Sequence, residues 1–163
     1  MEAAAKIKGY IGIDPGSAGS LCLFIPSTGQ IGFHDMKDST PSAILEWFNA
    51  ASDIFDIHMI MIEKVHAIQG TSAGSNFKFG YNVGMINALA EASGIGVDHI
   101  TPKMWQKKIG VTKKGPAIKK EVAQIAERLY PGAQIKGPRG GLLDGRSDAL
   151  CIAHYNYLKY TGK

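Results

Sequence analysis

The chain has 163 residues, of which 45% are hydrophobic and 20% charged, as is typical of a soluble globular domain and not of a disordered or fibrous protein. No apolar run approaches the roughly 20 residues that a membrane-spanning helix needs, so we expect no membrane partner. The formal net charge of +4 fits a polyanionic partner such as nucleic acid without requiring one.

The first part of the chain predicts three short strands, over residues 10–14, 19–26 and 30–36. A Pro-Ser-Thr-Gly turn at 26–29 separates the second strand from the third, and tight turns of this kind favour an antiparallel meander. A helix is expected next, ending near Ala51, because Ser39-Thr40-Pro41-Ser42 supplies a cap and a proline at its start.

Residues 58–65 predict a strand inside the sheet, because they are apolar almost throughout and would bury both faces. The remaining segments are expected to be a loop at 67–75, a helix at 76–93, a strand at 97–100, a helix from 102, a loop at 110–116, a helix at 117–129, a mobile glycine-rich stretch at 135–143 and a helix at 144–160. This order predicts an α/β fold in one domain spanning 1–163, with a mixed five-stranded sheet that is antiparallel first and parallel later.

The two cysteines, Cys22 and Cys151, lie in apolar runs and are expected to be buried thiols in a reducing compartment. The first eight residues are rich in Ala and Lys and lack the apolar stretch of a signal peptide. We therefore expect a cytoplasmic protein, made in a bacterium or in a phage-infected cell.

Four carboxylates stand where a structural residue would be unexpected. Asp14 ends the first strand, Glu63 lies near the end of the long apolar strand, and Asp144 and Asp148 begin the last helix. Strand ends and the first turn of a nearby helix can meet at one edge of a sheet, where the charges would repel one another unless a cation neutralised them. Oxygen-only ligands suit a hard ion such as Mg²⁺ or Mn²⁺.

Each of these residues also has a structural interpretation. An Asp-Pro-Gly sequence is most often a turn, an aspartate in a first helical turn is favoured by the helix dipole, and Glu63 can pair with Lys64 or an arginine. The joint pattern favours function, because Glu63 interrupts a strand that otherwise buries both faces and a charge there needs a partner.

Four segments in the order and spacing found here resemble the RuvC-type Holliday junction resolvases of the RNase H-like superfamily. The resemblance covers about residues 9–155, and the last segment is closest to variants in phage genomes. The segments are Ile11-Gly-Ile-Asp14-Pro-Gly16 with Gly19-Ser-Leu, Ile60-Met-Ile-Glu63-Lys-Val65, Thr101-Pro-Lys-Met-Trp-Gln-Lys-Lys108, and Asp144-Gly-Arg-Ser-Asp148-Ala-Leu-Cys-Ile-Ala153.

This resemblance implies an RNase H-like fold and a homodimer that nicks two strands of a four-way DNA junction. It implies catalytic and metal-binding roles for Asp14, Glu63 and Asp148, with two Mg²⁺ ions per site and Mn²⁺ as a substitute. Bacterial relatives carry their other last-helix ligand at the position of Gly145. Asp144 lies one residue earlier, on the helical face of Asp148, and is assigned as the fourth ligand.

The stretch from Lys103 to Lys120 contains seven lysines and no acidic residue. It is either a solvated face or a surface that contacts phosphates, and we favour phosphate contact because the chain resembles a DNA-handling family. Trp105 is expected in the core. The expected DNA-binding residues are Lys113, Lys114, Lys119 and Lys120 in this stretch, His66 at a position where some relatives carry an aromatic, Lys78 in the next helix, and Arg146 beside the last acidic pair.

Several alternatives remain open at this stage. An Ile-Gly-Ile-Asp-x-Gly opening also occurs in sugar kinases and actin-like ATPases, but those need two lobes and more than twice this length. A domain that binds branched nucleic acid without cutting it would gain nothing from a full set of carboxylates. Within the nucleases, the acids alone do not choose among a resolvase, a general flap or branch nuclease and an RNase H. The apolar face of Phe79, Val83, Ile86 and Leu89 is either core or dimer interface.

Overall fold

A computed structural model describes residues 5–66 and 69–163 of the chain. Its elements, in chain order, are β1 (Lys8–Asp14), β2 (Ser20–Ile25), β3 (Gln30–Asp35), α1 (Pro41–Ile54), β4 (Asp56–Glu63), α2 (Ala73–Ala92), β5 (Val97–Ile100), α3 (Pro102–Ile109), α4 (Ala117–Leu129) and α5 (Asp144–Thr161). No helix among these is long and apolar enough to cross a membrane.

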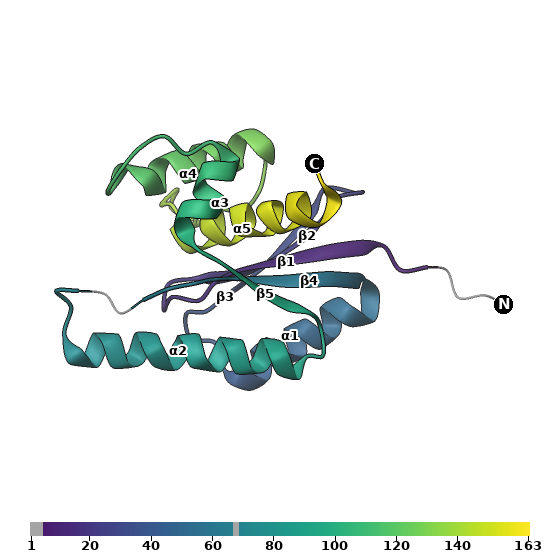
Figure 1. The fold of residues 1–163 in the computed structure, drawn as a ribbon, viewed down its shortest axis with the longest axis horizontal. Helices are drawn as coiled ribbons and strands as arrows, with labels where there is room; N and C mark the ends of the chain where they lie inside the picture. The colour runs from purple at the N-terminus through teal and green to yellow at the C-terminus, as the bar shows by residue number, and fades with distance from the viewer. Residues whose placement is uncertain (1–4, 67–68) are drawn as a thin grey trace.

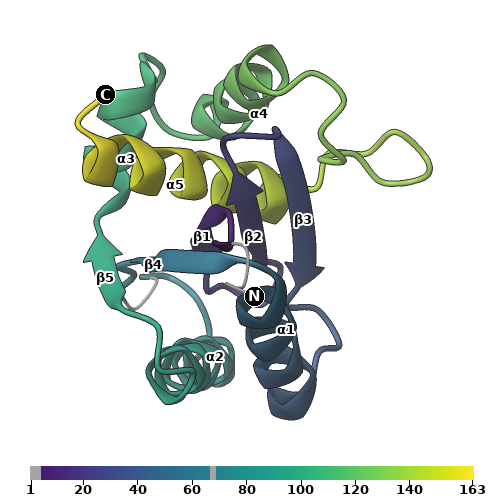
Figure 2. The same cartoon turned by 90° about the vertical axis from the view of Figure 1, so that its right-hand side faces the viewer.

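The strands form one five-stranded sheet in the order β3-β2-β1-β4-β5. β1, β2 and β3 form the antiparallel meander that the sequence predicts, and β4 and β5 then add in parallel to β1. Helices α3, α4 and α5 cover one face of the sheet, and α1 and α2 cover the other (Figures 1 and 2). The predicted mixed sheet is therefore confirmed.

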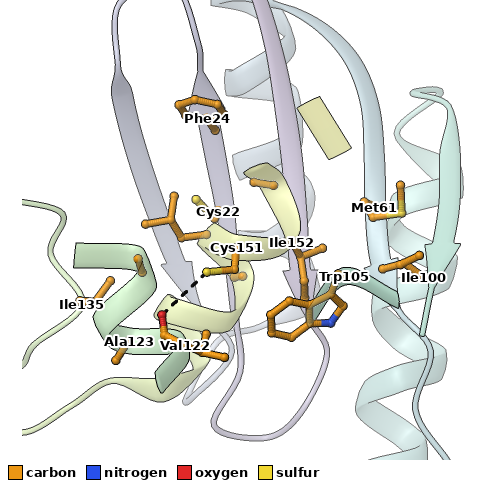
Figure 3. Packing of buried hydrophobic residues seen from close by; sticks show 14 residues of the cluster. Cys22, Phe24, Met61, Ile100, Trp105, Val122, Ala123, Ile135, Cys151 and Ile152 are labelled. Carbon is orange, nitrogen blue, oxygen red and sulfur yellow. Dashed lines mark hydrogen bonds between the residues drawn. The ribbon is translucent and has the colours of Figure 1, made fainter. Parts of the chain in front are cut away.

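Each face of the sheet carries its own hydrophobic cluster, because alternate side chains of β1 and β4 point to opposite sides. Ile11, Ile13, Ile60 and Ile62 pack toward α1 and α2, whereas Met61 packs toward α3, α4 and α5. Figure 3 shows the second cluster, in which both cysteines are buried and unpaired. The position of β4 inside the sheet is the one predicted from its apolar run.

A glycine lets α5 lie directly on β1. A Cβ atom at Gly12 would stand 2.2 Å from the backbone nitrogen of Ala153 and 2.4 Å from the carbonyl oxygen of Ala149. Because no side chain fits there, the helix axis comes closer to the central strand than ordinary packing allows. This contact fixes where the first turn of α5 meets the end of the sheet.

Several predicted boundaries were wrong. β4 runs from Asp56 to Glu63 and not over 58–65, and β1 begins at Lys8 and not at 10. α1 continues to Ile54, and α2 begins at Ala73, inside the stretch expected to be a loop. The Ser72 hydroxyl accepts a hydrogen bond from the Ser75 backbone N–H at 3.1 Å, so a serine in a loop-like sequence acts as an N-cap. Residues 67 and 68 of the expected loop lie outside the described residues.

Part of the apolar face of α2 belongs to the core. Ile86 is fully buried, and Leu89 packs against the cluster on the α1 side of the sheet. The opposite face of the same helix is open, with Phe77 78% and Tyr81 60% exposed. Of the predicted Phe79, Val83, Ile86 and Leu89 face, Ile86 and Leu89 thus belong to the core, whereas Phe79 and Val83 are partly exposed and lie outside it.

Candidate active site

Asp14 and Glu63 are neighbours at one edge of the sheet. β1 and β4 run parallel with Ile13 opposite Ile62, and each strand ends at the next residue, which is the carboxylate. The side chain of Asp14 is also held locally, because its Oδ1 accepts the Gly16 backbone N–H at 3.2 Å. The predicted convergence of the two strand ends therefore follows directly from the strand register.

The first turn of α5 reaches the same edge. A backbone bridge joins Gly145 to Gly19, which follows the loop after Asp14. A Cβ at Gly145 would stand 2.2 Å from the carbonyl oxygen of Ala18, so no side chain fits at this position. The packing of this turn against Ala18 therefore requires a glycine at position 145, and the role of the neighbouring Asp144 as a ligand stays a prediction.

Asp14, Asp144 and Asp148 line one cavity of about 390 Å³ together with Lys119. The Gly16–Gly19 turn forms one wall, and Ser75 and Phe79 of α2 form another. Glu63 is not among the lining residues, but the charge of Asp14 raises the pKa of Glu63, and the charge of Glu63 raises the pKa of Asp148. The structure thus gathers all four predicted carboxylates into one electrostatic unit.

These carboxylates are poorly solvated and repel one another. Burial raises the pKa of Asp148 to about 8, and the charges of Asp14, Glu63 and Asp144 add to that effect. Burial likewise raises the pKa of Glu63 to about 7, with the Asp14 charge contributing, and it raises the pKa of Asp14. A cluster in this condition favours the arrival of positive charge.

Lys119 supplies one such charge. It lies in the first turn of α4, and its ammonium group donates to the Asp144 carboxylate. That hydrogen bond raises the pKa of Lys119, and the charges of Asp148 and Asp14 act in the same direction. Of the four lysines singled out in the basic stretch, this is the one that the fold brings to the acidic cluster.

Glu63 has a partner that the sequence did not reveal. The indole N–H of Trp105 donates to Glu63 Oε1 at 2.8 Å. Trp105 is only 1% exposed, so its predicted place in the core is confirmed. The available signal was indirect: Ile100 pairs with Glu63, and α3 starts two residues later, so a residue in the first turns of α3 lies beside that carboxylate.

Arg146, in the first turn of α5, binds residues outside the acidic cluster. Its Nε and one terminal nitrogen each donate to the Asp35 carboxylate at 2.8 Å, the other terminal nitrogen donates to the Gln134 carbonyl at 2.9 Å, and the guanidinium lies over the Phe33 ring. These contacts favour a structural role, in which Arg146 ties α5 to the edge strand β3. Its role as a DNA contact stays a prediction, with this competing partner.

The other predicted DNA-binding residues are exposed. His66 follows β4, Lys78 lies on α2, Lys120 lies beside Lys119 on α4, and Lys113 and Lys114 lie in the loop before α4. That loop is held in shape, because the Glu121 carboxylate accepts hydrogen bonds from the Thr112 hydroxyl and from the backbone N–H groups of Thr112 and Lys113, at 2.7 to 3.0 Å. Their roles in binding DNA remain predictions.

Across residues 5–66 and 69–163, no group of three or more His, Cys, Asp or Glu side chains stands ready to hold a metal ion. Asp144 faces Lys119 and Glu63 faces Trp105, so the side chains share a site without forming a finished ligand shell. The donor chemistry nevertheless fits a hard cation, because every acidic group is an oxygen donor and a lysine ammonium already lies among them.

Two solved structures share the fold of this chain. Thermus thermophilus RuvC in complex with a Holliday junction substrate matches with a TM-score of 0.59 and 17% identity, over 92% of this chain and 94% of that one. A second Thermus thermophilus RuvC structure matches with a TM-score of 0.51 and 16% identity, over 93% and 95%. Neither a protein-family model nor a curated sequence matches the chain. The chain therefore has a RuvC-like, RNase H-like fold.

Proposed function

We propose that the protein is a Holliday junction resolvase, a metal-dependent endonuclease that places paired nicks in four-way DNA junctions. One observation carries the proposal: Asp14, Glu63 and the Asp144–Asp148 pair come from three separate segments and meet at one edge of a RuvC-like sheet. Branched DNA as the substrate is supported by the structural neighbour that is bound to a Holliday junction. The assignment to the phage-type branch rests on the motif Asp144-Gly-Arg-Ser-Asp148 at the start of the last helix.

Asp14, Glu63 and Asp148, helped by Asp144, would hold two Mg²⁺ or Mn²⁺ ions. Bound there, the ions would supply an activated water and stabilise the leaving 3′ oxygen of the phosphodiester. Asp14, Glu63 and Asp148 favour such binding because each is largely buried and lies near another negative charge. Lys119, once released from Asp144, is positioned to contact the negative charge of the reacting phosphate.

The DNA backbone would follow the basic side of the site. Lys119 lines the cavity that holds the aspartates, Lys120 follows it in the first turn of α4, and Lys113 and Lys114 lie in the loop before that helix. Lysines in this position contact phosphates without reading base sequence, and they steepen the salt dependence of binding. His66 and Lys78 would extend this surface beyond the end of β4.

A homodimer is part of the proposal, because two symmetric nicks need two active sites. The open face of α2 supports it: Phe77 and Tyr81 are exposed large side chains, and Gly84 and Ala88 continue the same face with small ones. Across a two-fold axis, such a face would bring two antiparallel helices into close contact. Analytical ultracentrifugation of the purified chain tests this component, and a strictly monomeric species at assay concentration contradicts it.

The interior of a bacterial or phage-infected cell is the proposed location, in keeping with two buried, unpaired cysteines.

The deciding experiment offers labelled substrates in parallel: a four-way junction, a flap, a linear duplex and an RNA–DNA hybrid, each with Mg²⁺, with Mn²⁺ and with EDTA. We expect paired symmetric nicks in the junction that EDTA abolishes. The Asp14→Asn variant is the control and should bind the junction without cutting it. Broad cutting of flaps and branches would change the function to a general branch nuclease, and cutting of the hybrid alone would change it to an RNase H. Tight binding without cutting in any metal would leave a binding module.

A further inference from the structure

Trp105 is a buried residue that contacts the acidic cluster and is not itself one of its carboxylates. Its indole N–H donates to Glu63 Oε1 at 2.8 Å, and the side chain is 1% exposed. An indole N–H is a donor with no acceptor capacity, so it complements a carboxylate and cannot replace one as a ligand. The contact crosses from α3 to the end of β4, between segments that are far apart in the chain.

The ring has little freedom to leave this position. It lies in the cluster that also holds Met61, Ile100 and Ile152, and Figure 3 shows it wedged between the end of β5 and helix α5. The backbone before it is fixed as well, because Ile100 pairs with Glu63 and α3 starts at Pro102. The donor is therefore held in place by core packing as well as by its hydrogen bond to the carboxylate.

We propose that Trp105 is the positioning residue for Glu63: it fixes one carboxylate oxygen and leaves the other, Oε2, directed to an incoming divalent cation. This inference rests on the proposed function of the same site. Carboxylates that bind metals depend on such outer hydrogen bonds for their orientation, and losing one costs about 10- to 100-fold in metal affinity or activity. Glu63 without Trp105 would lose its fixed direction.

The first test replaces Trp105 by Phe, which keeps an aromatic ring and removes the N–H. Calorimetric titration with Mn²⁺ should show affinity about 10- to 100-fold weaker than in the wild type. Junction cleavage should show a lower kcat with little change in KM for DNA, and raised Mn²⁺ should restore part of the rate. A variant that binds Mn²⁺ and cuts like the wild type overturns the inference.

Trp47 provides a matched control, because the chain has only two tryptophans. It lies on α1, on the opposite face of the sheet, and packs against Phe48 with ring centroids 5.8 Å apart. The Trp47→Phe change makes the same substitution at a partly buried position away from the site and should leave Mn²⁺ affinity unchanged. An equal loss in both variants would mean general destabilisation and would also overturn the inference.

A second readout is independent of cutting and of how well Trp105→Phe folds. In Trp47→Phe, Trp105 is the only tryptophan, and with excitation selective for tryptophan, paramagnetic Mn²⁺ bound at Glu63 should quench its fluorescence with a saturable titration. Adding Glu63→Gln should abolish or strongly weaken this response. Saturable quenching in a protein that cuts nothing would refute the nuclease while keeping the Trp105 contact. Cutting without any quenching would refute the Trp105 inference alone.

Discussion

The two ends of α5 hold carboxylates under opposite conditions. At its first turn, Asp148 is crowded by other acids, and burial raises its pKa to about 8. Near its last turn, Asp98 of β5 accepts hydrogen bonds from Lys159 at 2.5 Å, from Tyr160 at 2.8 Å and from the His99 backbone N–H at 2.7 Å. These contacts lower the pKa of Asp98 to about 2.

This difference is the one expected between a structural acid and an acid with the proposed role in metal binding. Asp98 is fully provided with donors and contributes to the fold by pairing with α5. Within residues 5–66 and 69–163, no comparable set of donors surrounds Asp148, and burial destabilises its charged form. Proteins retain such a condition at sites where the charge is used. Substitutions at the first turn of α5 should therefore affect DNA cutting more than stability, and substitutions near its last turn should affect stability more than cutting.

The largest effect is expected from Asp148→Asn. Cutting of the four-way junction should fall about a thousandfold or more, because a ligand to the catalytic ions is lost. Thermal stability without divalent ions should stay unchanged or rise, because one repelling charge is removed from the cluster. Cleavage assays and thermal melting of the same preparation test both halves, and a large loss of stability would contradict the functional assignment.

Gly145→Ala should be costly for both properties. The new Cβ would stand 2.2 Å from the Ala18 carbonyl oxygen, which is backbone and cannot move aside without shifting the turn after Asp14. We expect a loss of about 1–3 kcal/mol in the free energy of unfolding, as for overpacked cores, together with impaired cutting. Urea denaturation measures the first. Gly74→Ala is the control, because that glycine lies in α2 with open space around it and should lose nothing.

Added Mg²⁺ or Mn²⁺ should stabilise the wild type by binding at the carboxylates near the first turn of α5. An ion at a hundred times its dissociation constant raises the free energy of unfolding by about 2.7 kcal/mol if it binds only the folded state. Melting curves with and without EDTA measure this change. Asp98→Asn should respond to the metal like the wild type, whereas Asp14→Asn should respond weakly. An equal response in all three proteins would place the bound ion elsewhere.

The sequence was most informative where local rules determine the structure. The mixed sheet and the convergence of Asp14 and Glu63 could be predicted, because apolar runs define strands and parallel neighbours end at the same edge. The sequence could not predict the hydrogen bond from Trp105 to Glu63 or the salt bridge between Arg146 and Asp35. Both depend on side-chain conformations that only the packed helices α3 and α5 determine.

Because side-chain partners depend on packing, the sequence alone did not predict the partner of Arg146. An arginine between two aspartates in a protein expected to bind DNA suggested a phosphate contact, and no local signal pointed to Asp35, which lies on the edge strand. Lys119 shows the opposite case. It was one lysine among several, and only the packing of α4 against α5 brings its ammonium group to Asp144. Charge patterns thus identify surfaces better than they identify partners.

The smallest effect is expected from Asp98→Asn, which should cost about 0.5–1 kcal/mol, because the pair with Lys159 is partly exposed and screened. The stabilisation by Asp98 should also depend on pH in a defined direction. Folding lowers the pKa of Asp98 from 3.8 to about 2, so its contribution is complete above about pH 4 and disappears as the pH falls through about 2. Denaturation of wild type and variant should therefore differ at pH 6 and converge near pH 2, with junction cutting at neutral pH unchanged. A variant that instead loses cutting while keeping its stability would show that the far end of α5 also contributes to function.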